Sequence, residues 1–149
     1  MKNIKKELVE LMHTGYCSPR IVDLAKKLKE PSTTIHYNIK QMEKSKEIKA
    51  FKAVFDYKLI DEGLCNYVLI NLTPDEYGNP ERIGKELVSF PQIESIDIAT
   101  GGWEMILKVR TKDVDEFYQF VKNVLSKKGI AKTTSLTSLK QLKTEFVGI

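Results

Sequence analysis

The stretch LAKKLKEPSTTIHYNIKQME, residues Leu24–Glu43, decides the fold of the amino-terminal part of this 149-residue chain. Two helical patterns meet at Pro31, and the break between them is short enough to make the helices cross, as in a helix-turn-helix. In the second helix, Ile35, Ile39 and Met42 recur at helical spacing and form a narrow apolar seam. We expect this seam to pack against two preceding helices, leaving a polar face outward.

Two further helical patterns lead into this stretch. The first has its apolar stripe at Ile4, Leu8, Leu11 and Met12. It ends at Gly15, and Ser18-Pro19 predicts the next helix start, because Ser oxygens cap free N–H groups and Pro is tolerated at the first helical position. The second stripe consists of Ile21, Leu24, Ala25 and Leu28. Ser32 is expected to cap the third helix in the same way.

The polar face of the third helix is typical of a DNA reader. Hydroxyl, amide and ammonium groups hydrogen-bond to base edges and phosphates, and a helix N-terminus favours phosphate. The following stretch EIKAFKAVFD places apolar residues between lysines and predicts a short strand or hairpin, a wing. The candidate DNA-binding residues are Arg20, Ser32, Thr33, Thr34, His36, Tyr37, Lys40, Gln41, Lys44, Lys49 and Lys52. The alternative is an ordinary amphipathic helix with a solvated polar side.

Charge is unevenly distributed along the chain. Residues 1–60 carry 13 Lys/Arg and 7 Asp/Glu, whereas residues 61–149 carry 11 and 13. A basic amino-terminal part joined to a mildly acidic remainder indicates a polyanion partner for the first part only. A solvated lysine-rich surface is the alternative.

Cysteine usage and hydropathy bear on the compartment. Cys17 and Cys65 stand alone, without CxxC or metal-ligand spacing, which is typical of a reducing compartment. The start MKNIKKELVELM lacks a continuous apolar core, so we expect no signal peptide. No apolar run approaches the roughly 18 residues of a membrane span. We therefore expect a cytoplasmic protein without a membrane partner.

An enzyme is the least favoured class. His13 and His36 are the two histidines, and neither lies in a nucleophile or metal pattern. The sequence has no Gly-rich phosphate loop. We expect no cofactor.

The carboxy-terminal half predicts a second domain. Strand and helix patterns follow one another as CNYVLINL, NPERIGKELVSF, IESIDIAT, EMILKVRT, DVDEFYQFVKNVL and IAKTTSLTSLKQLK. The order βαββαβ is the ferredoxin-like split βαβ, with two helices on one face of an antiparallel sheet. Asp113 is expected to cap the second of these helices, and Gly129 to end it.

The first strand of this half predicts self-association. Tyr67 and Leu69 alternate with Val68, Ile70 and Leu72, so both faces of the strand are apolar. Because helices cover only one face of such a sheet, the other requires a partner. We predict a homodimer made by packing sheet on sheet, which also gives a DNA reader two helices at half-site spacing.

Both halves together resemble the Lrp/AsnC, or feast/famine, family of transcription regulators over nearly the whole chain. The helix-turn-helix pattern matches in register, and Thr100–Glu104 resembles the family's T-G-x-Tyr-Asp loop. Gly129-Ile130 with Thr133 and Ser135 resembles the G-V-x-x-T-x-T start of the last strand. The resemblance implies an α+β chain. Its parts are a winged helix-turn-helix at residues 1–53, a linker at 54–64, and a ferredoxin-like (RAM-type) domain at 65–149 for effector binding and oligomerisation.

The resemblance also implies dimers that assemble into tetramers, octamers or larger rings, with an amino-acid effector between dimers near the loop. We expect Glu104 to accept the ammonium group and the N–H groups around Gly101 and Gly102 to donate to the carboxylate. The hydroxyls of Thr133 and Ser135, on the last strand, add hydrogen-bond donors. The candidate effector-binding residues are Thr100, Gly101, Gly102, Trp103, Glu104, Thr133 and Ser135. The alternative is a plain hairpin turn in which the ring packs and the carboxylate is solvated.

Several positions depart from the family pattern. Lys29 and Pro31 replace Gly and Ser in the turn, and Asn38 replaces Arg in the third helix. Trp103-Glu104 replaces Tyr-Asp. Lys46 stands where Gly follows the helix, and Lys in a left-handed conformation costs about 1 kcal/mol relative to Gly. We therefore expect the third helix to end differently from the family.

The sequence thus predicts a regulator that binds double-stranded DNA sequence-specifically and responds to an amino acid or related metabolite. The competing hypothesis is a metabolite-sensing module that regulates an enzyme by protein contact, without DNA. That role leaves the basic wing and the polar face of the third helix unexplained.

Overall fold

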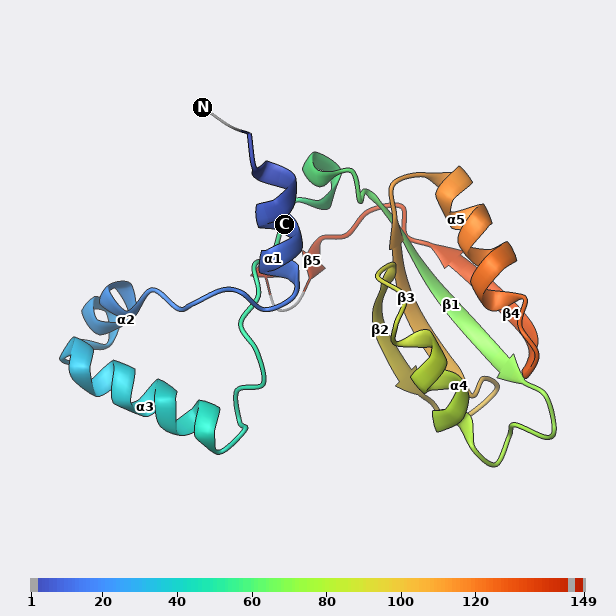
Figure 1. Cartoon of the computed structure of the whole chain (residues 1–149), viewed down its shortest axis with the longest axis horizontal. Coiled ribbons are helices and arrows are strands. Elements are labelled where there is room, and N and C mark those ends of the chain that lie inside the picture. Colours follow the sequence, from blue (N-terminus) through green and yellow to red (C-terminus); the bar gives the residue numbers. More distant parts are fainter. Residues whose placement is uncertain (1–2, 145–146, 149) are drawn as a thin grey trace. The chain divides into compact units, whose positions relative to one another are not determined.

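The computed structural model describes residues 3–144 and 147–148, and it separates into two compact units, Met1–Val54 and Phe55–Ile149. The first unit contains α1 (Lys5–His13), α2 (Ile21–Leu28) and α3 (Ser32–Lys44), shown in blue to cyan in Figure 1.

The helix-turn-helix consists of α2 and α3. Ala25 and Ile35 are buried, so the apolar seam of α3 packs on α2 as predicted. Met42, by contrast, remains 40% exposed. A core formed by three helices was predicted, but α1 contributes no buried residue. The buried contacts therefore lie between α2 and α3.

The predicted serine caps are wrong. α2 begins at Ile21 after Arg20, and α3 begins at Ser32 after Pro31, with no side-chain cap hydrogen bond at either start. Pro31 itself has the extended ψ of 142° that a cap position requires. Ser32 is therefore already helical, and its hydroxyl does not cap the helix.

The expectation that α3 ends differently is also wrong. Lys46 follows the helix with φ 64°, and Lys29 closes α2 with φ 55°, so both lysines adopt the left-handed conformation that favours glycine. The N–H of Lys46 donates to the Glu43 carbonyl at 3.2 Å, and that of Ile48 to Met42 at 3.1 Å. The turn geometry is thus kept at the cost of backbone strain.

The predicted wing is not a hairpin. In the described part of residues 47–56, the strand pairing is a single isolated bridge between Phe51 and Tyr16. A hairpin requires a tight turn between two strands, and EIKAFKAVFD contains no Gly, Asn or Pro to make one.

The second unit has the predicted ferredoxin-like order. Its elements are β1 (Leu64–Leu72), α4 (Pro80–Leu87), β2 (Ile93–Ile98), β3 (Met105–Thr111), α5 (Val114–Phe120) with a π-helical extension (Val121–Leu125), and β4 (Ile130–Thr137). The antiparallel sheet has the order β2-β3-β1-β4, and α4 and α5 cover one face of it (Figure 1). A short pair, β5 (Lys143–Thr144) and β6 (Val147–Gly148), follows. The carboxylate of Asp113 accepts from the N–H of Glu116 at 2.9 Å, which confirms the predicted cap.

The core lies between the sheet and the two helices. Alternate β1 residues, Val68, Ile70 and Leu72, face it and are buried, as the period of two predicts. On the other face, Tyr67 and Leu136 are paired directly across strands and are 38% and 53% exposed. The helix-free face therefore presents apolar side chains.

Residues 54–64, expected as a linker, contain a structured segment. A 3₁₀ helix, Tyr57–Ile60, belongs to the second unit, and the Asp56 side chain caps it by accepting from the N–H of Lys58. Tyr57 is buried because its ring packs against the sheet residue Arg110. Across the ranges that the structure describes, none of the helices combines the length and apolarity required to cross a lipid bilayer.

Candidate functional site

The first candidate surface is an open groove beside α3, with a volume of about 480 Å³. Its lining consists of Ile21, Ser32, Thr33, His36, Tyr37 and Lys40. The groove therefore brings together five of the side chains predicted to bind DNA. Tyr37 is 63% exposed, so its hydroxyl is available to a partner in solution.

The other predicted DNA-binding residues do not line this groove. They are Arg20, Thr34, Gln41, Lys44, Lys49 and Lys52, and all are exposed. The Arg20 guanidinium lies 3.8 Å from the carboxylate of Asp23. Lys49 and Lys52 lie in the segment that does not form the expected hairpin.

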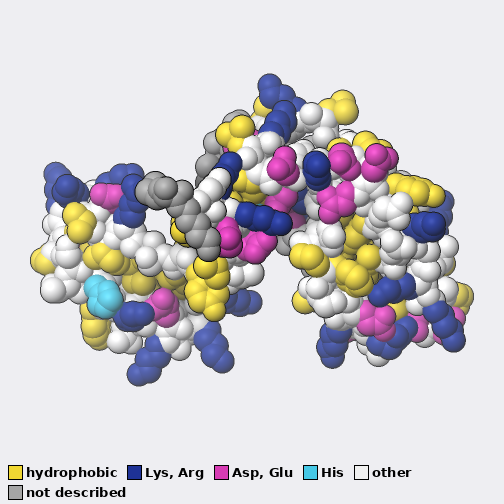
Figure 2. Space-filling model, turned by 45° about the horizontal axis from the view of Figure 1, so that its top comes forward, with side chains coloured by type: hydrophobic (Ala, Val, Ile, Leu, Met, Phe, Trp, Pro, Cys, Tyr) yellow, Lys and Arg dark blue, Asp and Glu magenta, His cyan; other side chains and the backbone are white. Residues whose placement is uncertain are grey.

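Two polar contacts along α3 were missed from the sequence. The Lys40 ammonium donates to the Glu43 carboxylate at 2.7 Å, and the Asn38 amide donates to the Thr34 carbonyl at 2.8 Å. The spacing of three residues is the signal for the Lys40–Glu43 pair, and Asn38 makes the bond to a carbonyl four residues earlier that is known for polar side chains on helices. On the face seen in Figure 2, Lys and Arg side chains alternate with Asp and Glu and do not form one continuous basic patch.

The second candidate is the loop between β2 and β3. It is anchored at its ends, because the N–H of Glu104 donates to the Ile70 carbonyl at 3.0 Å and the N–H of Ala99 to the Glu104 carbonyl at 2.9 Å. Gly101 has φ +117°, and a methyl group added at Gly101 or Gly102 meets nothing within 4 Å. The glycines thus leave backbone open to approach.

Glu104 is tied to the sheet by its side chain. Its Oε2 accepts from the backbone N–H of Leu72 at 2.8 Å and from the Asn71 amide at 3.3 Å. The same Asn71 amide donates to the Gly102 carbonyl at 2.7 Å. The alternative of a solvated carboxylate is therefore wrong. Asn71 was not predicted as a residue of this site. The signal that could have identified it is its polar side chain within an otherwise apolar strand.

Thr133 and Ser135 are not brought to Glu104. They pair with Ile70 and Val68, so their side chains share the helix-covered face of the sheet. Lys132 pairs with Asn71 on the opposite face, and its ammonium lies 5.9 Å from the Trp103 ring centroid. Thr100, at the start of the loop, is exposed.

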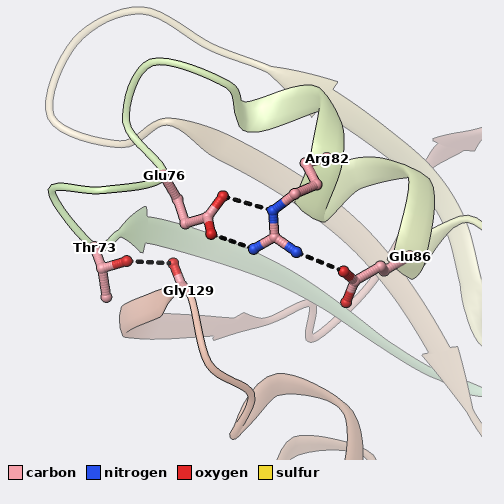
Figure 3. A network of polar contacts seen from close by, with 5 residues as sticks. All are labelled: Thr73, Glu76, Arg82, Glu86 and Gly129. Atoms are coloured by element: carbon pink, nitrogen blue, oxygen red, sulfur yellow. Dashed lines mark hydrogen bonds and ion pairs between the residues drawn. The ribbon is translucent and has the colours of Figure 1, made fainter.

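An ionic network stabilises the connection that follows β1 (Figure 3). Arg82 donates from Nε to Glu76 at 2.8 Å and from Nη1 to Glu86 at 2.7 Å, and its Nη2 also pairs with Glu76. Hydrogen bonding to Glu76 raises the pKa of Arg82. Thr73 donates its N–H and hydroxyl to the carbonyl of Gly129, which joins the two chain segments.

A second ionic cluster lies on the helix-free face. Glu94 Oε2 is 3.1 Å from both Lys108 Nζ and Arg110 Nε, and the Tyr57 hydroxyl donates to Oε1 at 3.3 Å. Burial by itself would raise the pKa of Glu94, but the Arg110 charge and the contact with Lys108 outweigh it and hold that pKa below its ordinary value. Burial raises the pKa of the neighbouring Cys65 thiol. The raised pKa keeps the Cys65 thiol neutral beside this ion-paired cluster.

The family follows from comparison with known sequences. Residues 65–147 match the profile described as the Lrp/AsnC ligand binding domain. The chain belongs to the Lrp/AsnC family. It is therefore a transcriptional regulator, and nothing in the comparisons supports the rival role of a module without DNA.

Curated relatives named as HTH-type transcriptional regulators match over both units. An uncharacterized HTH-type transcriptional regulator of Pyrococcus furiosus is 31% identical over 127 residues, covering 85% of each chain. The HTH-type transcriptional regulator FL11 of the same organism is 27% identical, covering 94% of this chain and 90% of its own.

Solved structures show the same fold. A Neisseria meningitidis transcriptional regulator, solved as a complex with L-Met, superposes with TM-score 0.73 at 21% identity, covering 93% of this chain and 89% of its own. AsnC of E. coli superposes with TM-score 0.71 at 17% identity, covering 99% and 97%. Both confirm the predicted combination of helix-turn-helix and ferredoxin-like units.

Proposed function

We propose that this Lrp/AsnC regulator binds duplex DNA through the groove-bearing side of α3. The observation that carries the proposal is the groove beside α3, because Thr33, His36, Tyr37 and Lys40 all line it and therefore lie on one side of one helix. Such groups read base edges in the major groove, whose width admits an α-helix. The exposed cations outside the groove are assigned to phosphates.

The protein acts as a homodimer in this proposal. The helix-free sheet face exposes the Tyr67–Leu136 pair, and burying such apolar surface favours association. A twofold dimer presents two copies of α3 to two half-sites. Dimers then assemble into a tetramer or octamer, as the family resemblance implies.

An amino-acid effector binds at the Thr100–Glu104 loop. The Neisseria structure with L-Met supports this class of ligand. We assign the ligand carboxylate to the N–H groups of Gly101 and Gly102, where the backbone is open. The ammonium group is assigned to Glu104 Oε1, because Oε2 already takes the two hydrogen bonds that position the side chain. Thr133 and Ser135, which lie on the opposite face of the sheet from Glu104, are not assigned to this ligand.

We place the protein in the cytoplasm, with the DNA, and assign it no catalytic activity, because its relatives are transcriptional regulators. No metal or organic cofactor enters the proposal.

The test is selection of bound fragments from genomic DNA, with and without a panel of amino acids. Enrichment of a shared palindromic motif is the expected result, and one amino acid should change the enrichment. The variant Tyr37→Ala should lose about 5- to 150-fold in affinity for the selected motif, since a good base contact contributes about 1–3 kcal/mol of discrimination. Failure to enrich any motif, with wild-type and variant protein alike, contradicts the proposed interface.

The matched control is Tyr118→Ala. Tyr118 lies on α5 of the other unit and is 60% exposed, close to the exposure of Tyr37. Tyr118→Ala should leave the affinity for the selected DNA motif unchanged.

A further inference from the structure

The recognition helix α3 carries a single carboxylate, Glu43, and that carboxylate is paired with a predicted DNA-binding lysine. The Lys40 ammonium and Glu43 Oε2 are 2.7 Å apart, with the side chains 60% and 34% exposed. Residues three apart are neighbours on one side of a helix, so the pair forms without distortion of α3.

The pair lies at one end of the groove. Lys40 lines the groove, and at about 100° per residue Glu43 falls on the same side of α3 as Ser32 and His36. A duplex seated in the groove therefore meets a negative charge, and it meets Lys40 already engaged by that charge. Both facts oppose binding to a polyanion, whatever its sequence.

The exposure of the pair allows DNA to compete for the lysine. Ion pairs between exposed side chains are weak and screened by salt. A guanine O6/N7 pair is thus able to take Lys40 from Glu43. A duplex that lacks a base acceptor at that position gains no such contact to offset the repulsion from the carboxylate.

We propose that Glu43 is a positioning residue that sets the DNA selectivity of this regulator: it holds Lys40 at the groove and suppresses binding to unrelated duplexes. The inference rests on the proposed DNA interface and adds to it a named determinant of specificity. It predicts that removing the negative charge increases affinity for all DNA while decreasing discrimination.

The test compares Glu43→Gln with wild type on two duplexes of equal length, the selected motif and an unrelated sequence, over a series of salt concentrations. For the unrelated duplex we expect affinity to rise several-fold and the log–log salt slope to steepen by about 0.9, the value for one additional phosphate neutralised. Affinity for the motif should rise less, so the ratio of the two affinities falls. Glu43→Asp, which keeps the charge, should retain the wild-type ratio.

Two controls separate this role from a general charge effect. Glu47→Gln removes the same charge just beyond α3, where the carboxylate accepts from the Ser45 hydroxyl at 2.6 Å, and it should leave the ratio unchanged. Glu43→Gln in a Lys40→Ala background should leave the salt slope unchanged, because the lysine through which Glu43 acts is absent.

The outcomes are distinguishable. If Glu43→Gln changes the salt slope equally in the wild-type and Lys40→Ala backgrounds, the inference is wrong. It is also wrong if Glu43→Gln leaves the salt slope for the unrelated duplex unchanged. A loss of affinity confined to the motif overturns it in favour of Glu43 reading a base directly, since carboxylates accept from cytosine N4. Wild-type protein that binds neither duplex overturns the proposed interface as well, whereas normal wild-type binding with an unaltered Glu43→Gln variant overturns this inference alone.

Discussion

Glu104 and Leu72 are joined by a hydrogen bond from the Leu72 backbone N–H to Glu104 Oε2, 2.8 Å long, which ties the loop between β2 and β3 to the end of the central strand β1. Leu72 is buried, so its N–H has little access to water as an alternative acceptor. A side chain that the family resemblance suggests for ligand binding therefore also holds the loop in place.

Glu104→Ala should destabilise the second unit by about 1–2 kcal/mol, because it leaves a buried N–H without its acceptor. Urea unfolding followed by fluorescence measures this, since Trp103 is the one tryptophan of the chain. Amide exchange at Leu72 should accelerate. Glu104→Gln keeps an oxygen acceptor, so its free energy of unfolding should fall by less. If amide exchange at Leu72 is unchanged in Glu104→Ala, the hydrogen bond between the two residues is unimportant in solution.

Gly129→Ala should destabilise the same unit by about 2–4 kcal/mol. Gly129 has φ +100°, and an added Cβ would lie 2.7 Å from Cδ1 of the buried Ile83. Gly102→Ala is the matched control, because its added Cβ meets nothing within 4 Å. The control should change the free energy of unfolding by less than about 0.5 kcal/mol. Equal losses for the two variants would refute the steric argument.

Lys46→Gly should stabilise the first unit by about 0.5–1 kcal/mol, since Lys46 has φ 64° and glycine adopts that conformation without the Cβ penalty. The measurement is thermal unfolding by far-UV circular dichroism, together with amide exchange in α3. Lys44→Gly, within the helix, is the control and should be destabilising. A destabilised Lys46→Gly variant would mean that the left-handed turn is absent in solution.

Glu94 should make stability depend on acid pH. Its pKa is lower in the folded state than its ordinary value of 4.5, because Arg110 and Lys108 favour the carboxylate. As pH falls, the unfolded chain takes up this proton first, so the contribution is fully present above the ordinary value and is lost as pH falls through the folded-state pKa.

Glu94→Gln should therefore weaken the decline in unfolding free energy below about pH 5. At pH 7 it should cost about 2 kcal/mol, because it removes charge-assisted hydrogen bonds to two cations. Urea unfolding at a series of pH values measures both effects. Glu81→Gln, at an exposed position of α4, is the control. Parallel pH curves for wild type and Glu94→Gln would contradict the assignment.

Much of the fold was predictable because the relevant patterns are local. The alternation of Val68 and Ile70 with Tyr67 and Leu69 correctly separated the core face of β1 from its open face. Asp113 was correctly identified as a cap from its place before an apolar helical stripe. The seam at Ile35 likewise predicted which side of α3 packs inward.

The wrong predictions concern the ends of α3 and the segment after it. Pro31 has the backbone conformation of a cap position, so Ser32 becomes the first helical residue and does not cap. Lys46 keeps a left-handed turn that its own Cβ disfavours, because the backbone hydrogen bonds of the turn compensate. The wing failed as a prediction because alternation between apolar residues and lysines does not by itself supply a partner strand.

The periodicities of the chain were sufficient to identify two units, the helix-turn-helix that contains α3 and the order βαββαβ, since spacing along a helix or strand is a property of neighbouring residues. The register between strands decided the rest. It joins Asn71 to Glu104 across 33 residues of sequence and sets Thr133 on the opposite face of the sheet from that carboxylate. Such contacts depend on which residues of distant strands lie side by side, and a pattern that repeats every two residues is the same for many registers.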